Sequence, residues 1–319
     1  MSERAPFEQF FAYRRLLPLA EITPDGERVL FASNLSGQFN LWSVAVDAGP
    51  GGGGWPEQLT SFADRTVRSA AVREDGTILF SADGDGDEFM QLYRIPAGGG
   101  WPEQLTDLAS VQHFLGANAW APDGRSFAFS ANSRTPADTE VFLWLDDEAE
   151  PRQLFGEGRY TFAAAFSPDG ARLLVADFRS NMDTSLFVVD VATGESVEAT
   201  PHEGEAKFFP GPWAGDGSGF HLLTYEGREF VGVAFHELAS GRREWVADPE
   251  RDVDELAGSA DGRMLAWIEN DDGWSVLRVR DLERGVELPA PRLPRGTVPV
   301  AGSGLSLSAD GRRLALLWD

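Results

Sequence analysis

A short turn motif ending in Asp-Gly recurs seven times along this chain, and it constrains the fold more than any other feature. The copies read TPDG, REDG, APDG, SPDG, AGDG, SADG and SADG, with the aspartates at Asp25, Asp75, Asp123, Asp169, Asp216, Asp261 and Asp310. Successive aspartates lie 50, 48, 46, 47, 45 and 49 residues apart. A period of this length, held over the whole chain, indicates a repeat architecture in which each copy is one supersecondary unit.

Each motif lies between two short runs that have the composition of β-strands. Around Asp169, for example, the runs are TFAAAF and ARLLVADF, both bounded by turn-forming residues. In the turn itself, proline presets φ for the first central position and aspartate tolerates the second. Glycine then takes the left-handed position that follows. The pattern therefore predicts a β-hairpin at every copy of the motif.

A third run follows in most repeats, and a fourth, more polar run closes it; FNLWSVAV and PEQLT are the first examples. Four antiparallel strands in each repeat make one blade of a β-propeller. We therefore expect an all-β fold, a seven-bladed β-propeller of four-stranded antiparallel blades, in a single domain over 1–319. The N-terminal segment covers 1–20, where FEQFFAYRRLL at 7–17 could form a short helix. The expected blades begin near residues 15, 65, 114, 160, 207, 253 and 303.

The last repeat is incomplete, because Asp310 and its glycine are followed only by RRLALLWD. The expected seventh blade therefore lacks its outer two strands, and the unpaired edge that results is a feature proteins normally avoid. Two explanations remain open. Either the N-terminal 20 residues supply an outer strand, or the chain is a fragment, which is the explanation we favour.

The nonapeptide GGGWPEQLT occurs twice without change, at 52–60 and 98–106. Its 46-residue offset matches the blade spacing, and both copies fall at the same place, the turn into the expected outermost strand. A later blade keeps this position but changes the letters, to EPRQLF at 150–155. A ligand-binding motif would keep its letters, so the duplication indicates a structural position. We expect Trp55 and Trp101 to cap blade edges.

The blade pattern, seen in AFSPDGARLLVADF (165–178) and ITPDGERVLFASNLSGQFNLWSV (22–44), resembles the propeller of the prolyl oligopeptidase superfamily. It is most similar to that of acylaminoacyl-peptidases, and it also resembles TolB-like and WD40-like propeller repeats. In those serine peptidases a C-terminal α/β-hydrolase domain, expected natively but absent from this chain, carries the catalytic triad. The resemblance implies a non-catalytic propeller that gates access and selects short peptides for the hydrolase domain. The alternative is a free-standing TolB-like propeller that acts as a protein-binding scaffold.

The chain itself offers no catalytic constellation. It has no Gly-x-Ser-x-Gly nucleophile turn; the nearest match, around Ser126, starts inside a hairpin turn. Cysteine is absent, and the four histidines have no partners at metal-ligand spacing: His113, His202, His221 and His236. We therefore expect no catalytic residue, metal or cofactor in this chain. The partner is expected to be a peptide, and a homo-oligomer is compatible with this interpretation.

The most distinctive local feature is an acidic loop whose candidate residues are Asp83, Asp85, Asp87 and Glu88. Alternating carboxylates begin oxygen-rich calcium loops, but the sixth position here is Glu88 rather than glycine and the twelfth is arginine. The resemblance implies a second use, because some relatives capture the cationic end of a peptide with paired acids from the propeller. A solvated loop between blade strands is the interpretation we favour. Asp146-Asp147 and Asp271-Asp272 are similar acidic pairs, for which we also favour a solvated loop.

The net charge of the chain argues against two classes of binding partner. The chain has 27 Lys and Arg residues against 51 Asp and Glu residues, a net charge of −24. Such a surface repels phosphate backbones and anionic lipids, so we expect neither a nucleic-acid partner nor a membrane partner. The first residues lack the shape of a signal peptide, and no apolar run is long enough to span a bilayer. A cytoplasmic location is therefore expected.

Overall fold

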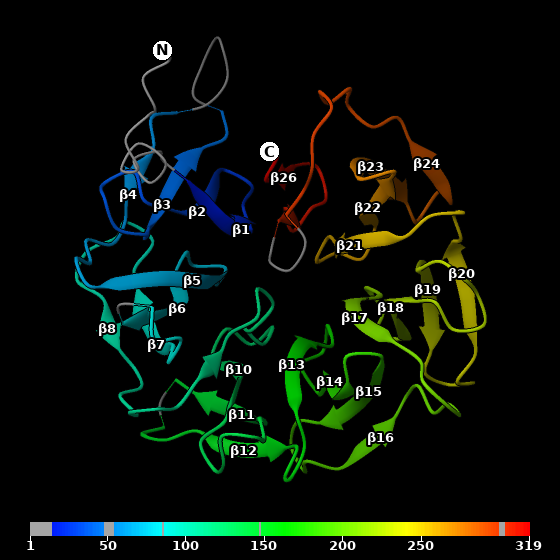
Figure 1. The fold of residues 1–319 in the computed structure, drawn as a ribbon, viewed down its shortest axis with the longest axis horizontal. Coiled ribbons are helices and arrows are strands. Elements are labelled where there is room, and N and C mark those ends of the chain that lie inside the picture. The colour runs from blue at the N-terminus through cyan, green and yellow to red at the C-terminus, as the bar shows by residue number, and fades with distance from the viewer. Residues whose placement is uncertain (1–14, 48–53, 85, 147, 300–303) are drawn as a thin grey trace, which may run out of the picture.

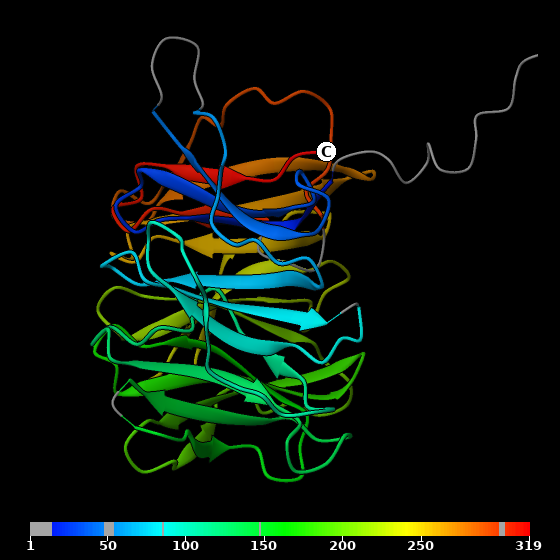
Figure 2. The ribbon, with the colours of Figure 1, turned by 90° about the vertical axis from the view of Figure 1, so that its left-hand side faces the viewer.

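The computed structural model describes residues 15–47, 54–84, 86–146, 148–299 and 304–319 as a ring of β-sheets around a central axis (Figure 1). Every regular element in these ranges is a strand. Seen from the side, the strands of successive sheets lie in layers (Figure 2). The helix considered at 7–17 falls mostly outside the described residues, and its last two residues belong to the first strand.

Six sheets have four antiparallel strands each, and in every one the strands lie side by side in chain order. The first is β1 (Leu16–Ile22), β2 (Arg28–Ser33), β3 (Asn40–Ala45) and β4 (Glu57–Gln58); the second is β5 (Arg65–Val72), β6 (Ile78–Gly84), β7 (Gln91–Ile95) and β8 (Glu103–Gln104). The third is β9 (His113–Phe114), β10 (Ser126–Ala131), β11 (Glu140–Leu145) and β12 (Arg152–Phe155); the fourth is β13 (Thr161–Phe166), β14 (Arg172–Ser180), β15 (Asp183–Asp190) and β16 (Ser196–Glu198). The fifth is β17 (Phe208–Trp213), β18 (Gly219–Thr224), β19 (Gly232–Glu237) and β20 (Arg243–Ala247); the sixth is β21 (Val253–Gly258), β22 (Met264–Asp271), β23 (Trp274–Asp281) and β24 (Val286–Leu288). β25 (Leu305–Leu307) and β26 (Leu314–Leu316) form a separate two-stranded sheet.

The blade count is therefore six, and the expectation of seven blades with an incomplete seventh is corrected. The seventh Asp-Gly turn does form a hairpin, between β25 and β26. Only three residues follow β26 in the sequence, too few for a third and a fourth strand. Four-stranded antiparallel blades, as the repeat predicts, are confirmed for the other six turns.

The Asp-Gly turns share one hydrogen-bonded geometry, which explains why the motif recurs. In all seven, the aspartate Oδ1 accepts the backbone amide of the residue two positions later. The glycine that follows has φ between 63° and 82°, a region that glycine enters without steric cost. In the turn at Asp169, the Ser167 hydroxyl donates at 2.5 Å and the Ala171 amide at 3.0 Å. Together they lower the pKa of the Asp169 carboxyl.

The repeated nonapeptide is a structural position, as its spacing predicts. The hydroxyl oxygens of Thr60 and Thr106 each accept a backbone amide from the third strand of their blade, at 2.9 Å. The prediction for the two tryptophans is wrong. Trp55 is 90% exposed and Trp101 is 91% exposed, so neither indole covers a blade edge.

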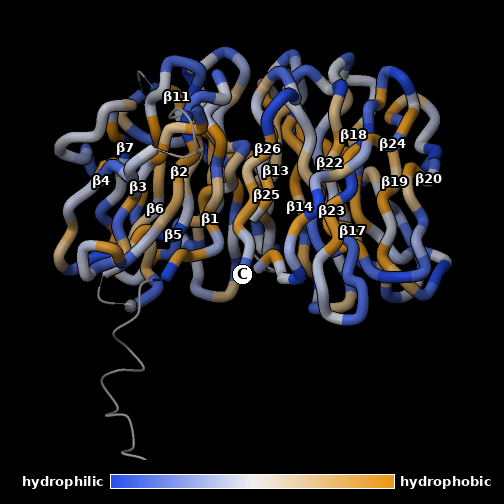
Figure 3. The backbone as a smooth tube through the Cα atoms, turned by 90° about the horizontal axis from the view of Figure 1, so that it is seen from above, coloured by the Kyte–Doolittle hydropathy of each residue, from blue (hydrophilic) through white to orange (hydrophobic). Residues whose placement is uncertain are grey.

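The hydrophobic core lies between neighbouring sheets rather than inside any one of them (Figure 3). Leu41 of the first sheet packs in one cluster with Phe80 of the second, and Ile268 of the sixth packs with Leu305 of the two-stranded sheet. In the described residues, six such clusters join successive sheets, but none of them joins β25–β26 to the first sheet. Hydrogen bonds and an ion pair join β25–β26 and the turn between them to the first sheet at that seam.

Candidate functional site

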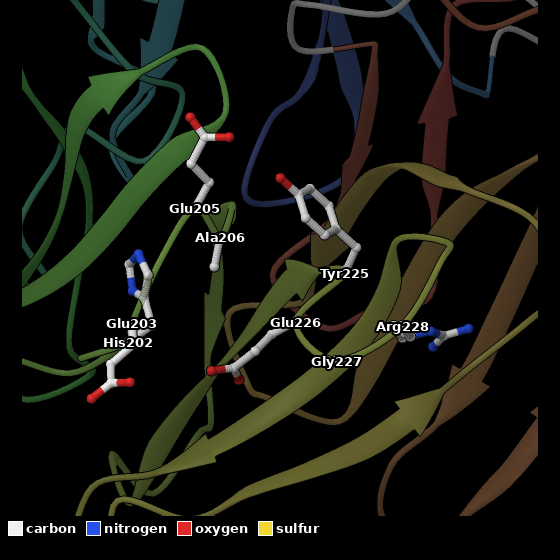
Figure 4. Close-up of a pocket in the computed structure, with 8 residues that line it drawn as sticks. All are labelled: His202, Glu203, Glu205, Ala206, Tyr225, Glu226, Gly227 and Arg228. Atoms are coloured by element: carbon white, nitrogen blue, oxygen red, sulfur yellow. The ribbon is translucent and has the colours of Figure 1, made fainter.

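A pocket of about 370 Å³ lies at the junction of the fourth and fifth sheets. One wall comes from the connection between β16 and β17, and the other from the loop between β18 and β19. The lining residues are His202, Glu203, Glu205, Ala206, Tyr225, Glu226, Gly227 and Arg228 (Figure 4). Both walls lie at the end of the blades opposite the Asp-Gly turns, where the first strand of each sheet begins.

His202 anchors the first wall. Its Nδ1 lies 2.7 Å from the backbone oxygen of Thr200, and its Nε2 lies 2.9 Å from Oδ1 of Asp183 on β15. Thr200 offers a backbone oxygen and Asp183 a carboxylate oxygen, so contacts occupy both ring nitrogens of His202. These contacts hold the connection between β16 and β17 against the fourth sheet.

The pocket has an excess of negative charge. Glu226 is paired with Arg243, whose Nη2 lies 2.7 Å from Glu226 Oε2. Glu203 and Glu205 are exposed, and in the described part of the chain neither has an ion-pair partner. Figure 4 shows the Glu205 carboxylate and the Tyr225 hydroxyl on opposite sides of the opening. A cationic group or a strong hydrogen-bond donor is therefore the ligand that this arrangement favours.

The one arginine that lines the pocket does not neutralise it. The Arg228 guanidinium points away from the opening (Figure 4) and stacks over the Trp245 ring at 4.7 Å. It also donates to the backbone oxygen of Pro249 at 2.6 Å. Arg228 therefore holds the outer part of the fifth blade together, and the carboxylates of Glu203 and Glu205 remain uncompensated.

Three of the four acidic-loop residues lie in the described part of the chain, where Asp83 differs from the other two in its surroundings. Asp83 is fully buried on β6, and the Arg68 guanidinium contacts both of its carboxylate oxygens, at 3.0 and 2.8 Å. Asp87 is exposed and accepts the Phe89 amide at 2.9 Å. Glu88 is exposed and has φ of 64°, while Asp85 lies outside the described residues. The described residues contain no group of three or more potential metal-ligating side chains.

The other candidate residues hold structural positions. The Ser126 hydroxyl donates to Asp123 within its hairpin turn, and His113 and His221 are buried against backbone oxygens. Asp146 pairs with Arg73 and Arg94, and Asp271 pairs with Arg251. The second member of the first pair, Asp147, lies outside the described residues. His236 is also buried, and its Nδ1 has no hydrogen-bond partner in the described residues.

Sequence reasoning missed the pocket at His202. The histidine and its partner Asp183 are 19 residues apart, and neither stands in a motif. Glu203 and Glu205 flank a glycine in a stretch that resembles an ordinary polar connection. A stretch with two glutamates beside a histidine, just before an inner strand, is the only signal that could have found the site.

Two further carboxyl groups lie on inner strands, close to the ring axis. Burial raises the pKa of Glu21 on β1 to about 8. Burial also raises the pKa of Glu255 on β21 to about 7, against an opposing hydrogen bond from the Gly304 backbone. Both side chains are partly buried. They are neutral over much of the pH range in which exposed carboxyls are charged.

No protein-family model matches the sequence, and no curated protein matches it either. Solved structures with the same fold include a prolyl endopeptidase, with a TM-score of 0.71 and 17% identity, over 96% of this chain and 45% of that one. TolB from Acinetobacter baumannii has a TM-score of 0.58 and 16% identity, over 87% of this chain and 63% of that one. An oligogalacturonate lyase in complex with manganese has a TM-score of 0.68 and 12% identity, over 95% and 85%. The likeness shows a β-propeller, and this chain spans less than two thirds of the first two structures.

The described part of the chain contains no helix long and apolar enough to cross a membrane.

Proposed function

We propose that this chain is the non-catalytic propeller of a serine peptidase, which limits access to a hydrolase domain and selects short peptides. The observation that carries the proposal is the structural match to a prolyl endopeptidase. It takes in 96% of this chain but only 45% of that one, as expected for a propeller that forms one part of a larger enzyme. The blade pattern quoted above points the same way.

The acidic pocket gives this propeller a way to select its peptides. Every free peptide carries one cationic amino terminus, and the uncompensated carboxylates of Glu203 and Glu205 can hold it. The Tyr225 ring supplies a flat surface for the first side chain. Because the pocket holds about 370 Å³, it suits one or two residues rather than a folded protein.

Titration of the chain with short peptides, with free or acetylated amino termini, tests the role of the pocket. We expect acetylation to weaken binding at least about tenfold, which corresponds to about 1.4 kcal/mol. The double variant Glu203→Gln with Glu205→Gln should lose the same factor. Glu195→Gln, a control at an exposed turn of the fourth blade, should leave binding unchanged. Equal affinity for free and acetylated peptides would exclude this pocket as the recognition site.

Labelling of the native protein with a fluorophosphonate probe, which reacts with activated serines, tests the peptidase role. We expect a labelled species of roughly twice the 34.8 kDa of this chain, recognised by an antibody against the propeller. An unlabelled native protein of 34.8 kDa would contradict the peptidase proposal. It would favour the second candidate, a free-standing TolB-like scaffold, which the match to TolB supports. For either function we propose a cytoplasmic protein.

A further inference from the structure

A second pocket, of about 360 Å³, lies between the third and fourth sheets, which are neighbours in the ring (Figure 1). Leu143 and Leu145 of β11 form part of one wall. The other wall includes Gly170, from the Asp-Gly turn of the fourth blade, and Asp190, the last residue of β15. This pocket therefore lies at the Asp-Gly end of the blades, opposite the first pocket, and the two share no lining residue.

At the junction of the second and third sheets, an arginine side chain occupies the equivalent place. Arg73 Nη1 donates to the backbone oxygen of Gly124, the glycine of the next Asp-Gly turn, at 3.0 Å. The same nitrogen lies 2.9 Å from Oδ2 of Asp146, which directly follows β11. Arg94 contacts the other oxygen of Asp146 at 2.5 Å, so one carboxylate at this junction holds two guanidinium groups.

A second junction shows the same arrangement. Where β25–β26 meet the first sheet, Arg313 donates to the backbone oxygen of Gly26, again the glycine of the next Asp-Gly turn, and pairs with Asp47. Asp47 lies two residues after β3. In both cases a guanidinium bridges the oxygen of a turn glycine and a carboxylate from the end of a third strand. The fourth blade presents the same two groups to the second pocket, through Gly170 and Asp190.

The third blade supplies no arginine to fill this place. Arg73 stands two residues before its turn aspartate, whereas the residue two before Asp123 is Ala121. Arg313 stands three residues after its turn aspartate, whereas the residue three after Asp123 is Ser126. The Ser126 hydroxyl donates to Asp123 within its own turn, and both side chains are too short to cross the junction. The repeat therefore leaves a place for a guanidinium open here.

The two acceptor groups at this place still have room for a donor. In the described residues, no group donates a hydrogen bond to the backbone oxygen of Gly170. Oδ1 of Asp190 accepts hydrogen bonds from its own turn, at Ala192 and Thr193, while Oδ2 has no partner within the ranges that the structure describes. Glu148 also lines the pocket; it is exposed and forms no ion pair in the described part of the chain.

One arginine lines the pocket but does not take this place. Arg152 comes from the outer strand β12, and its Nη2 donates to the backbone oxygen of Val191. The carboxylates of Asp190 and Glu148 outnumber this one guanidinium, so the pocket has a net negative charge. The chain as a whole has a net charge of −24. These charges attract a cationic ligand and repel a second copy of the chain.

We propose that the second pocket binds the guanidinium group of an arginine side chain from a basic partner polypeptide. The guanidinium donates to the Gly170 oxygen and to the Asp190 carboxylate, as arginines of this chain do at the other two junctions. The planar fork of arginine reaches both acceptors at once, whereas the ammonium group of lysine is compact and strongly hydrated. Leu143 and Leu145 cover the methylene groups of the stem. This inference does not depend on the proposed function, because it rests on the comparison of blade junctions.

Titration with the peptide acetyl-Gly-Arg-Gly-amide, followed by NMR, tests the proposal. Both ends of the peptide are blocked, so it lacks the free amino terminus that we propose for the first pocket. The backbone amide signals of Ala171 and Ala192 should shift and saturate, and those of Glu203 and Gly227 should not move. A citrulline peptide, which keeps the shape of arginine but not its charge, should bind at least about tenfold more weakly. A lysine peptide should also bind more weakly.

Asp190→Asn removes the charge of the acceptor but keeps an oxygen that can accept the hydrogen bonds of its turn. It should weaken binding of the arginine peptide at least about tenfold. Glu237→Gln is the matched control, because Glu237 ends the third strand of the fifth blade. Its backbone oxygen accepts the Gly241 amide, just as that of Asp190 accepts the Gly194 amide. This control should leave binding unchanged.

Ser126→Arg gives the third blade the arginine that the last repeat has at this position. We expect its guanidinium to fill the pocket, so the arginine peptide should no longer bind. The double variant Glu203→Gln with Glu205→Gln should bind this peptide as the unaltered chain does, which separates the second pocket from the first. If Ser126→Arg does not fold, the comparison of Asp190→Asn with its control still decides.

Three results would overturn the proposal. The first is equal affinity for the arginine and citrulline peptides. The second is a folded Asp190→Asn or Ser126→Arg variant that binds the arginine peptide as tightly as the unaltered chain. The third is a dimer in light scattering that is lost in Asp190→Asn, which would assign the pocket to an arginine of a second copy.

Discussion

Arg313 Nη1 donates a hydrogen bond of 2.6 Å to the backbone oxygen of Gly26, which lies 287 residues earlier in the chain. The same guanidinium pairs with Asp47 of the first blade. Two other polar contacts accompany it: the Ile22 amide bonds the Ser306 hydroxyl at 2.9 Å, and the Ala309 amide bonds the Pro24 oxygen at 3.2 Å. These contacts close the ring where no buried apolar cluster of the described residues does.

Arg313→Ala should weaken this seam and lower the free energy of unfolding by about 1.5–3 kcal/mol, since hydrogen bonds to charged groups contribute about that much. The Arg313 side chain is 37% exposed, which places the effect at the lower end. Arg312→Ala is the control, because its side chain is 86% exposed and only loosely paired. Urea denaturation measures both, and equal stability of the two variants would refute the role of Arg313.

Glu21 should make stability depend on pH. An ordinary glutamate releases its proton near pH 4.5, whereas Glu21 in the folded chain keeps it to about pH 8. Between these values the folded chain binds more protons than the unfolded chain, so the free energy of unfolding falls as pH rises. Glu21→Gln should match the unaltered chain near pH 4 and exceed it in stability near pH 9. Thermal unfolding across this range checks the prediction, with exposed Glu27→Gln as the control.

Asp83 should act as a structural residue. Asp83→Ala would leave the Arg68 guanidinium without its partner, and removal of one member of a buried ion pair typically costs about 3–5 kcal/mol. Arg68 is 39% exposed and can recover water, so we expect about 2 kcal/mol. Asp87→Asn, in the same loop but exposed, should change stability little. A stable Asp83→Ala variant that had lost peptide binding would instead make Asp83 a recognition residue.

Substitution of the glycine of an Asp-Gly turn should lower stability because of the backbone conformation alone, since this glycine has a positive φ. Gly170 has φ of 71°, and an added Cβ would meet only Pro122 at 3.6 Å, an ordinary contact. Gly170→Ala should therefore cost about 1 kcal/mol through strain at positive φ. Gly98→Ala has an ordinary φ and open space, so it should be neutral or slightly stabilising. Denaturant midpoints compare the two variants.

The two tryptophans of the repeated nonapeptide should contribute little to stability. Trp55→Ala and Trp101→Ala should each change the free energy of unfolding by less than about 0.5 kcal/mol, because both side chains are almost fully exposed. Trp213→Ala is the contrast: that indole is 7% exposed and donates to the Ala165 oxygen at 3.0 Å. Its loss should cost about 3–5 kcal/mol. A large loss from Trp55→Ala would show that the indole packs after all.

The sequence by itself determined the hairpins and the blade type, because the information for them is local. An Asp-Gly turn is specified by a carboxylate and an amide two residues apart, with a glycine between them at positive φ, as at Asp169 and Gly170. Strands on either side follow from short apolar runs bounded by turn residues. The repeat of this unit predicts stacked four-stranded blades without any long-range contact.

Only the tertiary structure decided how the ring closes and which polar groups meet. The seventh turn looks like the others in sequence, yet β25 and β26 form a two-stranded sheet that is hydrogen-bonded to the first blade. His202 meets Asp183, and Asp83 of the acidic loop meets Arg68, because the blades bring different strands and loops together at their ends. The conformation of a turn depends on a few consecutive residues, so the sequence predicts it. Burial and charge pairing depend on residues that are distant in the sequence and become neighbours only when the ring closes.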